Sequence, residues 1–570
     1  TIVTNMGCYH DFNPLALDAK LESIVSPTSN MTVGATTPIT VKLTNIGTTN
    51  LDSVKIYWIV NGGSINVYNW TNGPLTFFNT TPTITLGTFV PQSGYNTVEV
   101  YISQPNGGVD MNTSNDTLSI RAYSCGSALS GVYTVGSGGD YNDESEVMDA
   151  LTICGISGPV VFNFANGIYG NLSISGITGS STTNTITFSS ASGNAADVVF
   201  MVSATEALLL NNAANMIFNC ITLDASSNMS ACGVKFMGHN SNILFTGCNI
   251  KADPNTTNSQ SAAVYYGNTN GSNNYLQNVN FINNKIDGGY YNFYLYYPAS
   301  SSTYMASTGM SVTIDSNIMT NSYNMGIRSY YYARYASISY NSISSRTTGS
   351  VTSSWYGMYL YNYQNVDSII GNKIKSVHTS IQQPRGIYIE SYFNSASYNG
   401  SGSGLIANNE IQLHGSYPSG NYTSFCGILI NNPYANVNVY HNSIYLYQSS
   451  SNTTYGSCIY PYNTNSSYVI DLKNNNLVTS LTSGTYYYLY PLYISSSTYA
   501  GSSYCTRDYN NYYNANSTTI AYAGGTRTLS TLQSGFSQDA NSVNVAPSYL
   551  NINNSLELTA VGNSGITCPR

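Results

Sequence analysis

The sequence predicts an all-β protein, with an N-terminal immunoglobulin-like β-sandwich followed by a long right-handed parallel β-helix that carries a short N-terminal capping helix. Three observations predict this fold class. Apolar and polar residues alternate in the first part of the chain, a short pattern recurs at variable spacing in the rest, and one segment has a convincing helical period. The 570 residues suffice for two domains, which we expect at 1–124 and 125–570.

Charged residues are scarce in this chain. They make up 7% of it, against about 25% in typical soluble domains, and 53 tyrosines cover much of the surface together with Ser, Thr and Asn. The net charge of −8 offers no basic face, which excludes nucleic acid and anionic membranes as expected partners. No run of ~18 apolar residues predicts insertion into a membrane. Residues 1–10 lack the features of a signal peptide, so we interpret the sequence as a mature or trimmed product.

The β-sandwich is predicted by period-two patterns between about residues 15 and 121. The clearest are "ITVKLTNIG" (39–47), "SVKIYWIV" (53–60) and "TVEVYIS" (97–103). Turn residues such as Asn61-Gly62-Gly63 separate the strands. This length is typical of an immunoglobulin-like sandwich.

One stretch of the sandwich carries oxygen ligands at alternate positions. "DMNTSND" (110–116) offers Asp110, Asn112, Ser114 and Asp116, in the pattern of a calcium loop. The glycine at the sixth position and the glutamate at the twelfth are missing, so an ordinary polar hairpin turn explains the stretch equally well. Calcium is therefore a weak cofactor hypothesis, and no other cofactor or metal is predicted.

A capping helix is expected at about 142–153, within "YNDESEVMDALTICG" (141–155). Asp143 suits its N-cap, and Val147, Ala150 and Leu151 line one face. "GPVVFNF" (158–164), which follows, has the pattern of a buried strand.

A repeat dominates the chain from about 215 to 500, and it contains Asn-x-Ile or a close variant. The final residues, which lie 25 to 37 residues apart, are Ile221, Ile250, Ile286, Ile318, Ile343, Ile374, Ile411, Ile444 and Leu477. A constant local pattern with variable spacing indicates a fixed structural rung joined by loops of different length. Because these segments are rich in β-branched residues and asparagine, stacked turns of a parallel β-helix are favoured over helical repeats.

An internal asparagine ladder is the second expectation from the repeat. In stacked coils, inward asparagines at the corners can bond to main-chain groups that the strands leave unpaired. The asparagines two residues before each rung end are Asn219, Asn284, Asn341, Asn372, Asn409, Asn442 and Asn475, and Cys248 and Ser316 take this position in the other two copies.

A second strand precedes each rung, as in "GMYLY" (357–361) and "GIYIE" (386–390). The residues one and three after glycine are mostly aliphatic and should point inward, so those two and four after should point outward. This predicts a stacked outer stripe of Tyr294, Tyr296, Tyr330, Tyr359, Tyr361 and Tyr388. A purely structural explanation is that tyrosine suits the solvent-exposed face of a sheet. The alternative is a face that binds a ligand or another copy of the chain.

Two stretches carry a resemblance to a known family. "SGVYTVGSGGDYNDESEVMDAL" (130–151), continued by "GISGPVVFNFANGIYG" (155–170), resembles the opening coils of secreted right-handed parallel β-helix proteins of Bacteroidota, in the pectate-lyase-like superfamily. "FSQDANSVNVAPSYLNINNSLELTA" (536–560) looks like their closing segment, and the sandwich resembles their adhesion-type domains. The superfamily includes enzymes and non-enzymes, so the resemblance implies the fold more strongly than an activity.

The same resemblance implies export to the cell surface. Such proteins usually leave by type IX secretion with a C-terminal sorting domain, which this sequence does not show, so we expect cleavage or a fragment of a longer protein. Bacteroidota also O-glycosylate Asp-Ser/Thr-aliphatic sites, which makes Ser53, Thr117 and Ser368 candidates.

The sequence offers one candidate for catalysis. Lyases and hydrolases of this fold use clustered carboxylates, and Asp224 and Asp253, each three residues past its rung isoleucine, should lie on neighbouring coils. The non-catalytic explanation is that Asp residues at these positions begin polar turns after strands.

Ten cysteines without metal-site spacing fit disulfides in an oxidising compartment, although buried thiols are an alternative. Spacing suggests the pairs Cys125 with Cys154, Cys426 with Cys458, and Cys505 with Cys568.

Two functions follow from these observations. The first is a non-catalytic extracellular surface adhesin, stalk or fibre protein, whose tyrosine-rich face binds a glycan or a cell-surface protein or mediates self-association. The second is a polysaccharide lyase or glycoside hydrolase that uses an acidic groove with Asp224 and Asp253.

Overall fold

The computed structural model confirms the predicted fold class. It describes residues 14–28, 31–202, 204–267, 275–297, 310–331, 333–362, 365–390, 403–415, 424–433, 435–448, 454–463, 466–481, 487–552 and 555–559. These form two compact units, of which unit 1 comprises residues 1–130 and 146–157, and unit 2 comprises 131–145 and 158–570. Within the described residues, no helix combines the length and apolar composition needed to cross a membrane.

Unit 1 is a β-sandwich built from the alternating strands. One sheet contains β1 (Ala19–Ser26), β3 (Thr37–Asn45) and β6 (Ile84–Phe89). The other contains β2 (Met31–Thr32), β8 (Thr117–Cys125), β7 (Gly94–Ser103), β4 (Val54–Val60) and β5 (Asn66–Trp70), with the short 3-10 helices η1 (Pro105–Gly107) and η2 (Thr113–Asn115) between β7 and β8. The inward positions, among them Val41, Ile56 and Val100, form one buried core.

The predicted helix is α1 (Glu144–Cys154). Val147, Ala150 and Leu151 are buried as expected. From Glu146 onward α1 groups with unit 1, where Asp149 accepts a hydrogen bond from the Tyr95 hydroxyl at 2.7 Å.

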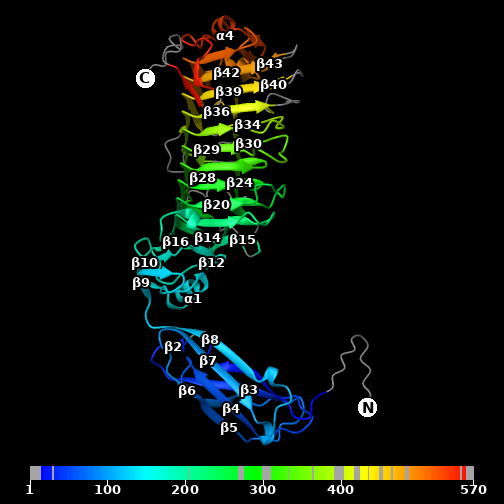
Figure 1. The fold of residues 1–570 in the computed structure, drawn as a ribbon. Helices are drawn as coiled ribbons and strands as arrows, with labels where there is room; N and C mark the ends of the chain where they lie inside the picture. The colour runs from blue at the N-terminus through cyan, green and yellow to red at the C-terminus, as the bar shows by residue number, and fades with distance from the viewer. Residues whose placement is uncertain are drawn as a thin grey trace. The chain divides into compact units, whose positions relative to one another are not determined.

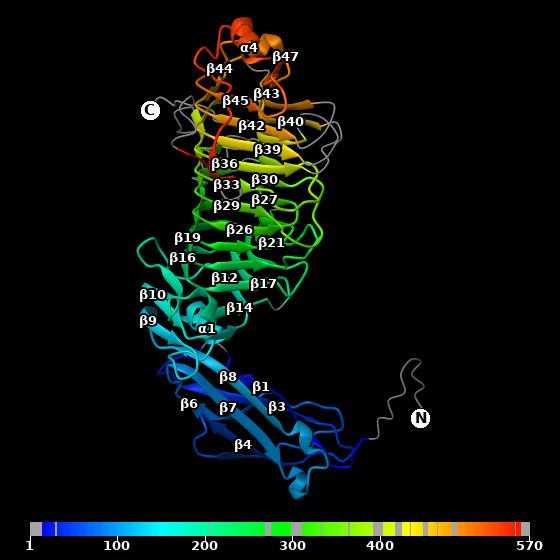
Figure 2. The same ribbon diagram turned by 45° about the horizontal axis from the view of Figure 1, so that its top comes forward.

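Unit 2 is a parallel β-helix with three sheets, and a typical coil contributes one strand to each of them (Figures 1 and 2). The first sheet contains β9 (Leu129–Val135), β10 (Ile156–Phe164), β13 (Ile186–Ser190), β16 (Ala214–Asn219), β19 (Asn240–Thr246), β22 (Leu276–Ile282), β25 (Val312–Asp315), β28 (Arg334–Ser339), β31 (Asn365–Val366), β32 (Ser368–Ile370), β35 (Ser403–Ala407), β38 (Asn436–Tyr440), β41 (Ile470–Lys473) and β44 (Cys505–Asp508).

The second sheet contains β11 (Gly167–Tyr169), β14 (Val198–Met201), β17 (Thr222–Ala225), β20 (Asn249–Ala252), β23 (Lys285–Asp287), β26 (Ile318–Ser322), β29 (Ser342–Ser345), β33 (Lys373–Lys375), β36 (Glu410–Gly415), β39 (Ser443–Gln448), β42 (Asn476–Leu481) and β45 (Asn511–Asn514). The third contains β12 (Leu172–Ser175), β15 (Glu206–Asn211), β18 (Cys232–Met237), β21 (Ala262–Gly267), β24 (Tyr291–Tyr296), β27 (Met325–Tyr330), β30 (Tyr356–Tyr361), β34 (Arg385–Glu390), β37 (Cys426–Asn431), β40 (Thr454–Tyr462), β43 (Tyr487–Ile494), β46 (Ala521–Ala523) and β47 (Thr526–Arg527).

Equivalent residues of successive coils stack inside the β-helix. Phe218, Phe245 and Phe281 of the first sheet are stacked with ring centroids 4.8 Å apart. In the second sheet, Ile343 pairs with Ile374, which pairs with Ile411. The core is therefore a set of continuous apolar columns, as the recurring sequence pattern predicts.

The C-terminal segment closes the last coil. It contains α3 (Ser497–Ala500), α4 (Leu529–Phe536) and the hairpin of β48 (Tyr549–Asn551) and β49 (Ser555–Leu558), while η3 (Ala195–Asp197) lies near the other end. After α4, the fully buried carboxylate of Asp539 accepts hydrogen bonds from Arg507 at 3.0 Å and from Tyr512 at 2.8 Å. The hairpin contacts the second sheet, where the Leu556 N–H donates to Glu410 at 2.9 Å.

Candidate functional site

The predicted tyrosines lie on the outer side of the third sheet. One outward column runs through Tyr265, Tyr294, Arg328, Tyr359, Tyr388, Leu429 and Tyr460. A parallel column runs through Tyr296, Tyr330 and Tyr361. We refer to Tyr294, Tyr296, Tyr330, Tyr359, Tyr361 and Tyr388 as the tyrosine face, and each is half-buried with part of its ring exposed.

Rings of the tyrosine face contact one another along and across the strands. The ring centroids of Tyr359 and Tyr388 are 5.0 Å apart, and the ring planes are inclined by 26°. The ring centroids of Tyr330 and Tyr361 are 4.9 Å apart. The Arg328 guanidinium, in the column between Tyr294 and Tyr359, lies 4.6 Å from the centre of the Tyr330 ring. These contacts fix the side chains in a continuous aromatic surface.

The tyrosine face contains a hollow where the column changes from tyrosine to leucine. Leu429 is paired between Tyr388 and Tyr460, and its smaller side chain leaves space between their rings. The hollow measures about 290 Å³ and is lined by Tyr356, Tyr359, Arg385, Tyr388, Leu429, Asn431, Tyr460 and Tyr462. Leu429 itself is only 2% exposed and forms an apolar cluster with Cys426 and Tyr460.

Polar groups surround this apolar floor. The Arg385 guanidinium lies 4.6 Å from the centre of the Tyr356 ring. The Tyr388 hydroxyl donates a hydrogen bond to Glu390 at 2.7 Å. Burial raises the pKa of Tyr359, and burial followed by the Glu390 carboxylate raises that of Tyr388. Both hydroxyls therefore remain protonated at neutral pH, and the single proton of Tyr388 is donated to Glu390.

Sequence reasoning did not single out Tyr356, Arg385, Tyr460 or Tyr462. The pattern held a usable signal, because "GILIN" (427–431) has leucine where the preceding coils have Tyr359 and Tyr388. A large-to-small change in a surface column predicts a hollow.

The structure contains the asparagine ladder, with two corrections. Main-chain N–H groups donate to the next side-chain oxygen along Asn284, Asn317, Asn341, Asn372, Asn409, Asn442, Asn475 and Asn510. Asn317, not Ser316, belongs to this column. Asn219 does not belong to it, because its side chain donates to Ser189. Ile221 occupies the corner position that the ladder asparagines have in later coils. The expectation for Asn219 was therefore wrong.

The two candidate catalytic carboxylates are not paired. Asp224 is paired in register with Lys251, and its carboxylate lies 3.1 Å from the Lys251 ammonium. Asp253 lies beyond the end of β20 and accepts a hydrogen bond from the Asn255 N–H. Asp224 and Asp253 lie on neighbouring coils, as expected, but two residues out of register, because Leu223, not Ile221, is the rung equivalent of Ile250. Burial favours a higher pKa for Asp224, but hydrogen bonds from Ser226 and the Lys251 charge hold its pKa below the ordinary value.

The predicted calcium loop is divided between two environments. Asp110 and Asp116 are 7% and 6% exposed. Asn112 and Ser114 lie nearer the surface and bond to each other at 2.7 Å. Burial, followed by the neighbouring carboxylates of Asp110 and Asp18, raises the pKa of Asp116 to about 7. The described residues contain no gathered group of three or more His, Cys, Asp or Glu side chains that is ready to hold a metal.

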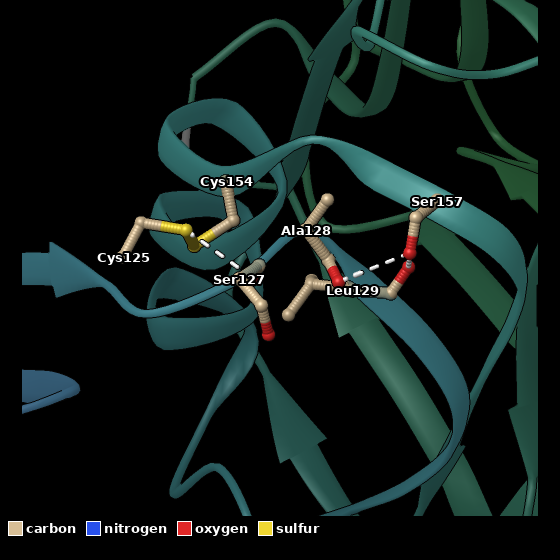
Figure 3. Close-up of a disulfide and its surroundings, with 6 residues drawn as sticks. All are labelled: Cys125, Ser127, Ala128, Leu129, Cys154 and Ser157. Atoms are coloured by element: carbon tan, nitrogen blue, oxygen red, sulfur yellow. Dashed lines mark hydrogen bonds between the residues drawn. A yellow bond between two sulfur atoms is a disulfide. The ribbon is translucent and has the colours of Figure 1, made fainter.

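One of the three suggested disulfides is present (Figure 3). Cys125, at the end of β8, is bonded to Cys154, at the end of α1. The pair Cys426 and Cys458 is wrong, because Cys426 is paired in register with Ser457 and Cys458 points to the opposite side of the sheet. Cys505 is a buried free thiol, so its suggested disulfide with Cys568, a residue outside the described ones, is not formed.

The glycosylation candidates lie in or next to strands. Thr117 is exposed at the start of β8, while Ser53 and Ser368 are half-buried. Their modification stays a prediction.

No protein-family model matches the chain, and no curated protein matches its sequence. Among solved structures, a pectin methylesterase from Aspergillus niger is similar over 64% of this chain and 90% of its own, with 13% identity and a TM-score of 0.25. The catalytic domain of a GH87 α-1,3-glucanase is similar over 93% of this chain and 98% of its own, with 12% identity and a TM-score of 0.29. A CARDB domain from Pyrococcus furiosus, solved with di-metal ions, covers 20% of this chain and 98% of its own, with 19% identity and a TM-score of 0.17. These likenesses concern the fold alone.

Proposed function

We propose that this chain is a non-catalytic extracellular surface protein, an adhesin, that binds a glycan on the tyrosine face of its β-helix. The observation that carries the proposal is the hollow between Tyr388 and Tyr460, with its leucine floor, aromatic walls and polar rim. Exposed apolar patches mark many interaction surfaces, and a hollow lined by aromatic side chains with a few polar groups is typical of a ligand site.

The chemistry of the hollow fits a sugar better than a charged polymer. A sugar ring has an apolar face that can lie on an aromatic ring and a rim of hydroxyl groups that need hydrogen-bond partners. Tyr359 and Tyr388 offer the rings, and Arg385 and Asn431 offer donors beside them. Nucleic acid is disfavoured because the chain has only 17 Lys and Arg residues against 25 acidic ones.

Among the described residues, the two carboxylates considered for the enzyme alternative do not form a comparable site. Retaining and inverting glycosidases need two carboxyl groups about 5–10 Å apart across the scissile bond. The carboxylate proposed for this role, Asp224, is engaged by Lys251 and Ser226 instead. A rigid stack of coils carrying one recognition surface suits a stalk or adhesin.

A cell-surface location in a Bacteroidota species, with export by type IX secretion, is part of the same proposal. It rests on the sequence resemblance and is supported by the disulfide between Cys125 and Cys154, because disulfides persist in oxidising compartments.

The test is a glycan array with the full chain, followed by product analysis of every glycan that binds. We expect binding of a restricted set of glycans and no cleavage products, with binding lost in Tyr388→Ala and retained in Tyr57→Ala, which alters a stacked tyrosine of the sandwich. Cleavage that Asp224→Asn abolishes would establish the enzyme. Self-assembly into fibres that Tyr388→Ala prevents, without glycan binding, would make the face an assembly surface.

A further inference from the structure

One end of the sandwich brings together three segments, far apart in sequence, that each carry a buried carboxylate. Asp18 directly precedes β1, Asp110 follows η1, and Asp116 directly precedes β8. They are 4%, 7% and 6% exposed. Two hydrogen bonds bring the segments together, from the Ala19 N–H to Asp110 at 2.9 Å and from the Asn115 amide to Asp18 at 3.1 Å.

The charges of this cluster are not compensated by protein cations. None of the ion pairs formed by the described residues includes Asp18, Asp110 or Asp116. An isolated carboxylate is costly to bury, and neighbouring carboxylates add repulsion. The sandwich therefore holds negative charge that requires either protonation or a bound cation.

Two oxygen atoms in the cluster lack a donor. The Asp116 Oδ1 atom is buried, and no group of the described residues donates a hydrogen bond to it. The amide oxygen of the adjacent Asn115 is also buried without a donor, although its nitrogen bonds to Asp18. Buried oxygens that lack donors are rare in native proteins, and a bound ion is one of the arrangements that satisfies them.

We propose that this end of the sandwich binds a calcium ion through the carboxylates of Asp110 and Asp116, the amide oxygen of Asn115 and main-chain oxygens of the same loops. Asp18 contributes a third negative charge and orients Asn115. Mixed carboxylate, amide and main-chain oxygens in an irregular loop suit Ca²⁺, which accepts six to eight ligands in flexible geometry. Mg²⁺ requires near-octahedral geometry and retains its waters.

The proposed site differs from the loop read from the sequence. Asn112 and Ser114 bond to each other and lie outside it, while Asp18 and Asn115 replace them. This inference does not depend on the ligand of the tyrosine face.

The test is isothermal titration of the chelator-treated full chain with CaCl2 and, separately, with MgCl2. We expect one saturable calcium site in the wild type and affinity at least ~10-fold weaker in Asp116→Asn. The matched control Glu99→Gln neutralises an exposed carboxylate on β7 of the same sandwich and should bind calcium as the wild type does.

Thermal unfolding shows whether the Asp116→Asn variant is folded, so that a loss of calcium binding can be told from a loss of structure. Without calcium, Asp116→Asn should unfold at or above the wild-type temperature because it removes a buried charge, and calcium should raise the unfolding temperature of the wild type but not of the variant. Failure of the wild type to bind millimolar calcium, or equal binding by Asp116→Asn, would overturn the proposal. Magnesium affinity equal to that for calcium would overturn the choice of ion.

Discussion

At the residue scale, asparagine organises the interior corners of the β-helix. The Asn372 oxygen accepts the N–H and the side-chain amide of Asn341, at 3.0 and 2.9 Å. Its own amide donates to the Ile338 carbonyl and to Asn409, at 2.8 and 3.0 Å. One side chain thus satisfies groups on both neighbouring coils, which no charged residue of similar size could do without burying its charge.

Replacing Asn372 by alanine should destabilise the β-helix. The change leaves a buried N–H and a buried carbonyl without partners, which should lower the free energy of unfolding by about 2–4 kcal/mol. Urea unfolding followed by circular dichroism measures the loss. Thr379→Ala, at an exposed position seven residues on, should stay within about 0.5 kcal/mol of wild type. Equal stability of the two variants would contradict a structural role for the ladder.

Asp224 should contribute stability and not catalysis. Its pKa is held below the ordinary value of 3.8, so its ion pair with Lys251 stabilises the fold above that pH and the contribution is lost as the pH falls through the lowered pKa. Asp224→Asn should therefore be less stable than wild type at pH 7, by on the order of 1 kcal/mol, and nearly equal to it in strong acid. Unfolding curves from pH 2 to 7 would show this convergence. Asp253→Asn leaves the ion pair intact and serves as the control, and a constant offset for Asp224→Asn at all pH values would count against the interpretation.

At the scale of strands and coils, the sequence predicts the elements well and their register less well. The rung at Ile318 is displaced by one residue, because Met319 pairs with Ile286 and Ile343 while Ile318 is 49% exposed. Two adjacent apolar residues fit the pattern equally, and only the stacked neighbours decide between them. A similar ambiguity affects the rung at Ile221, where Leu223, two residues further on, takes the equivalent position. This shift of two residues explains why the expectations for Asn219 and for the register of Asp224 and Asp253 were wrong.

The cysteine pairs illustrate the same limit. Cys426 and Cys458 are 32 residues apart, whereas the register between their strands joins residues 31 apart, as in Cys426 with Ser457. A shift of one residue moves a side chain through the sheet. Cys125 and Cys154 were predictable because both flank the one clear helix. The hollow on the tyrosine face could not be predicted in full, since it requires the register of several coils at once.

Glycines of the third sheet permit close packing between strand and rung. At Gly357, a Cβ atom would lie 2.4 Å from the Ile374 Cγ2 atom and 2.7 Å from the Gly386 carbonyl oxygen. Gly357→Ala should therefore force the coils apart and destabilise the β-helix by about 1–3 kcal/mol. Gly176→Ala, where a Cβ makes ordinary contact at 3.4 Å, is the matched control. Equal unfolding midpoints in urea for these two variants would contradict this packing.

At the scale of the whole molecule, tyrosine and asparagine take the roles that charged residues have in most soluble proteins. Asparagine bonds the coils inside, and tyrosine covers the third sheet outside. The result is a β-helix with a tyrosine-rich outer face that carries few charges, for which we propose glycan binding, joined in one chain to a sandwich for which we propose calcium binding. Such a molecule would recognise its ligand by shape and hydrogen bonding, so binding should depend weakly on salt.

The most direct test of the central claim is the affinity of the full chain for the glycan that binds best on the array. Isothermal titration should give an affinity at least ~10-fold weaker for the double variant Tyr359→Ala/Tyr388→Ala than for the wild type, because aromatic rings in the centre of an interface carry much of its binding energy. Tyr57→Ala should bind as the wild type does. Unchanged affinity in the double variant would contradict the account, because the glycan would then be bound elsewhere on the molecule.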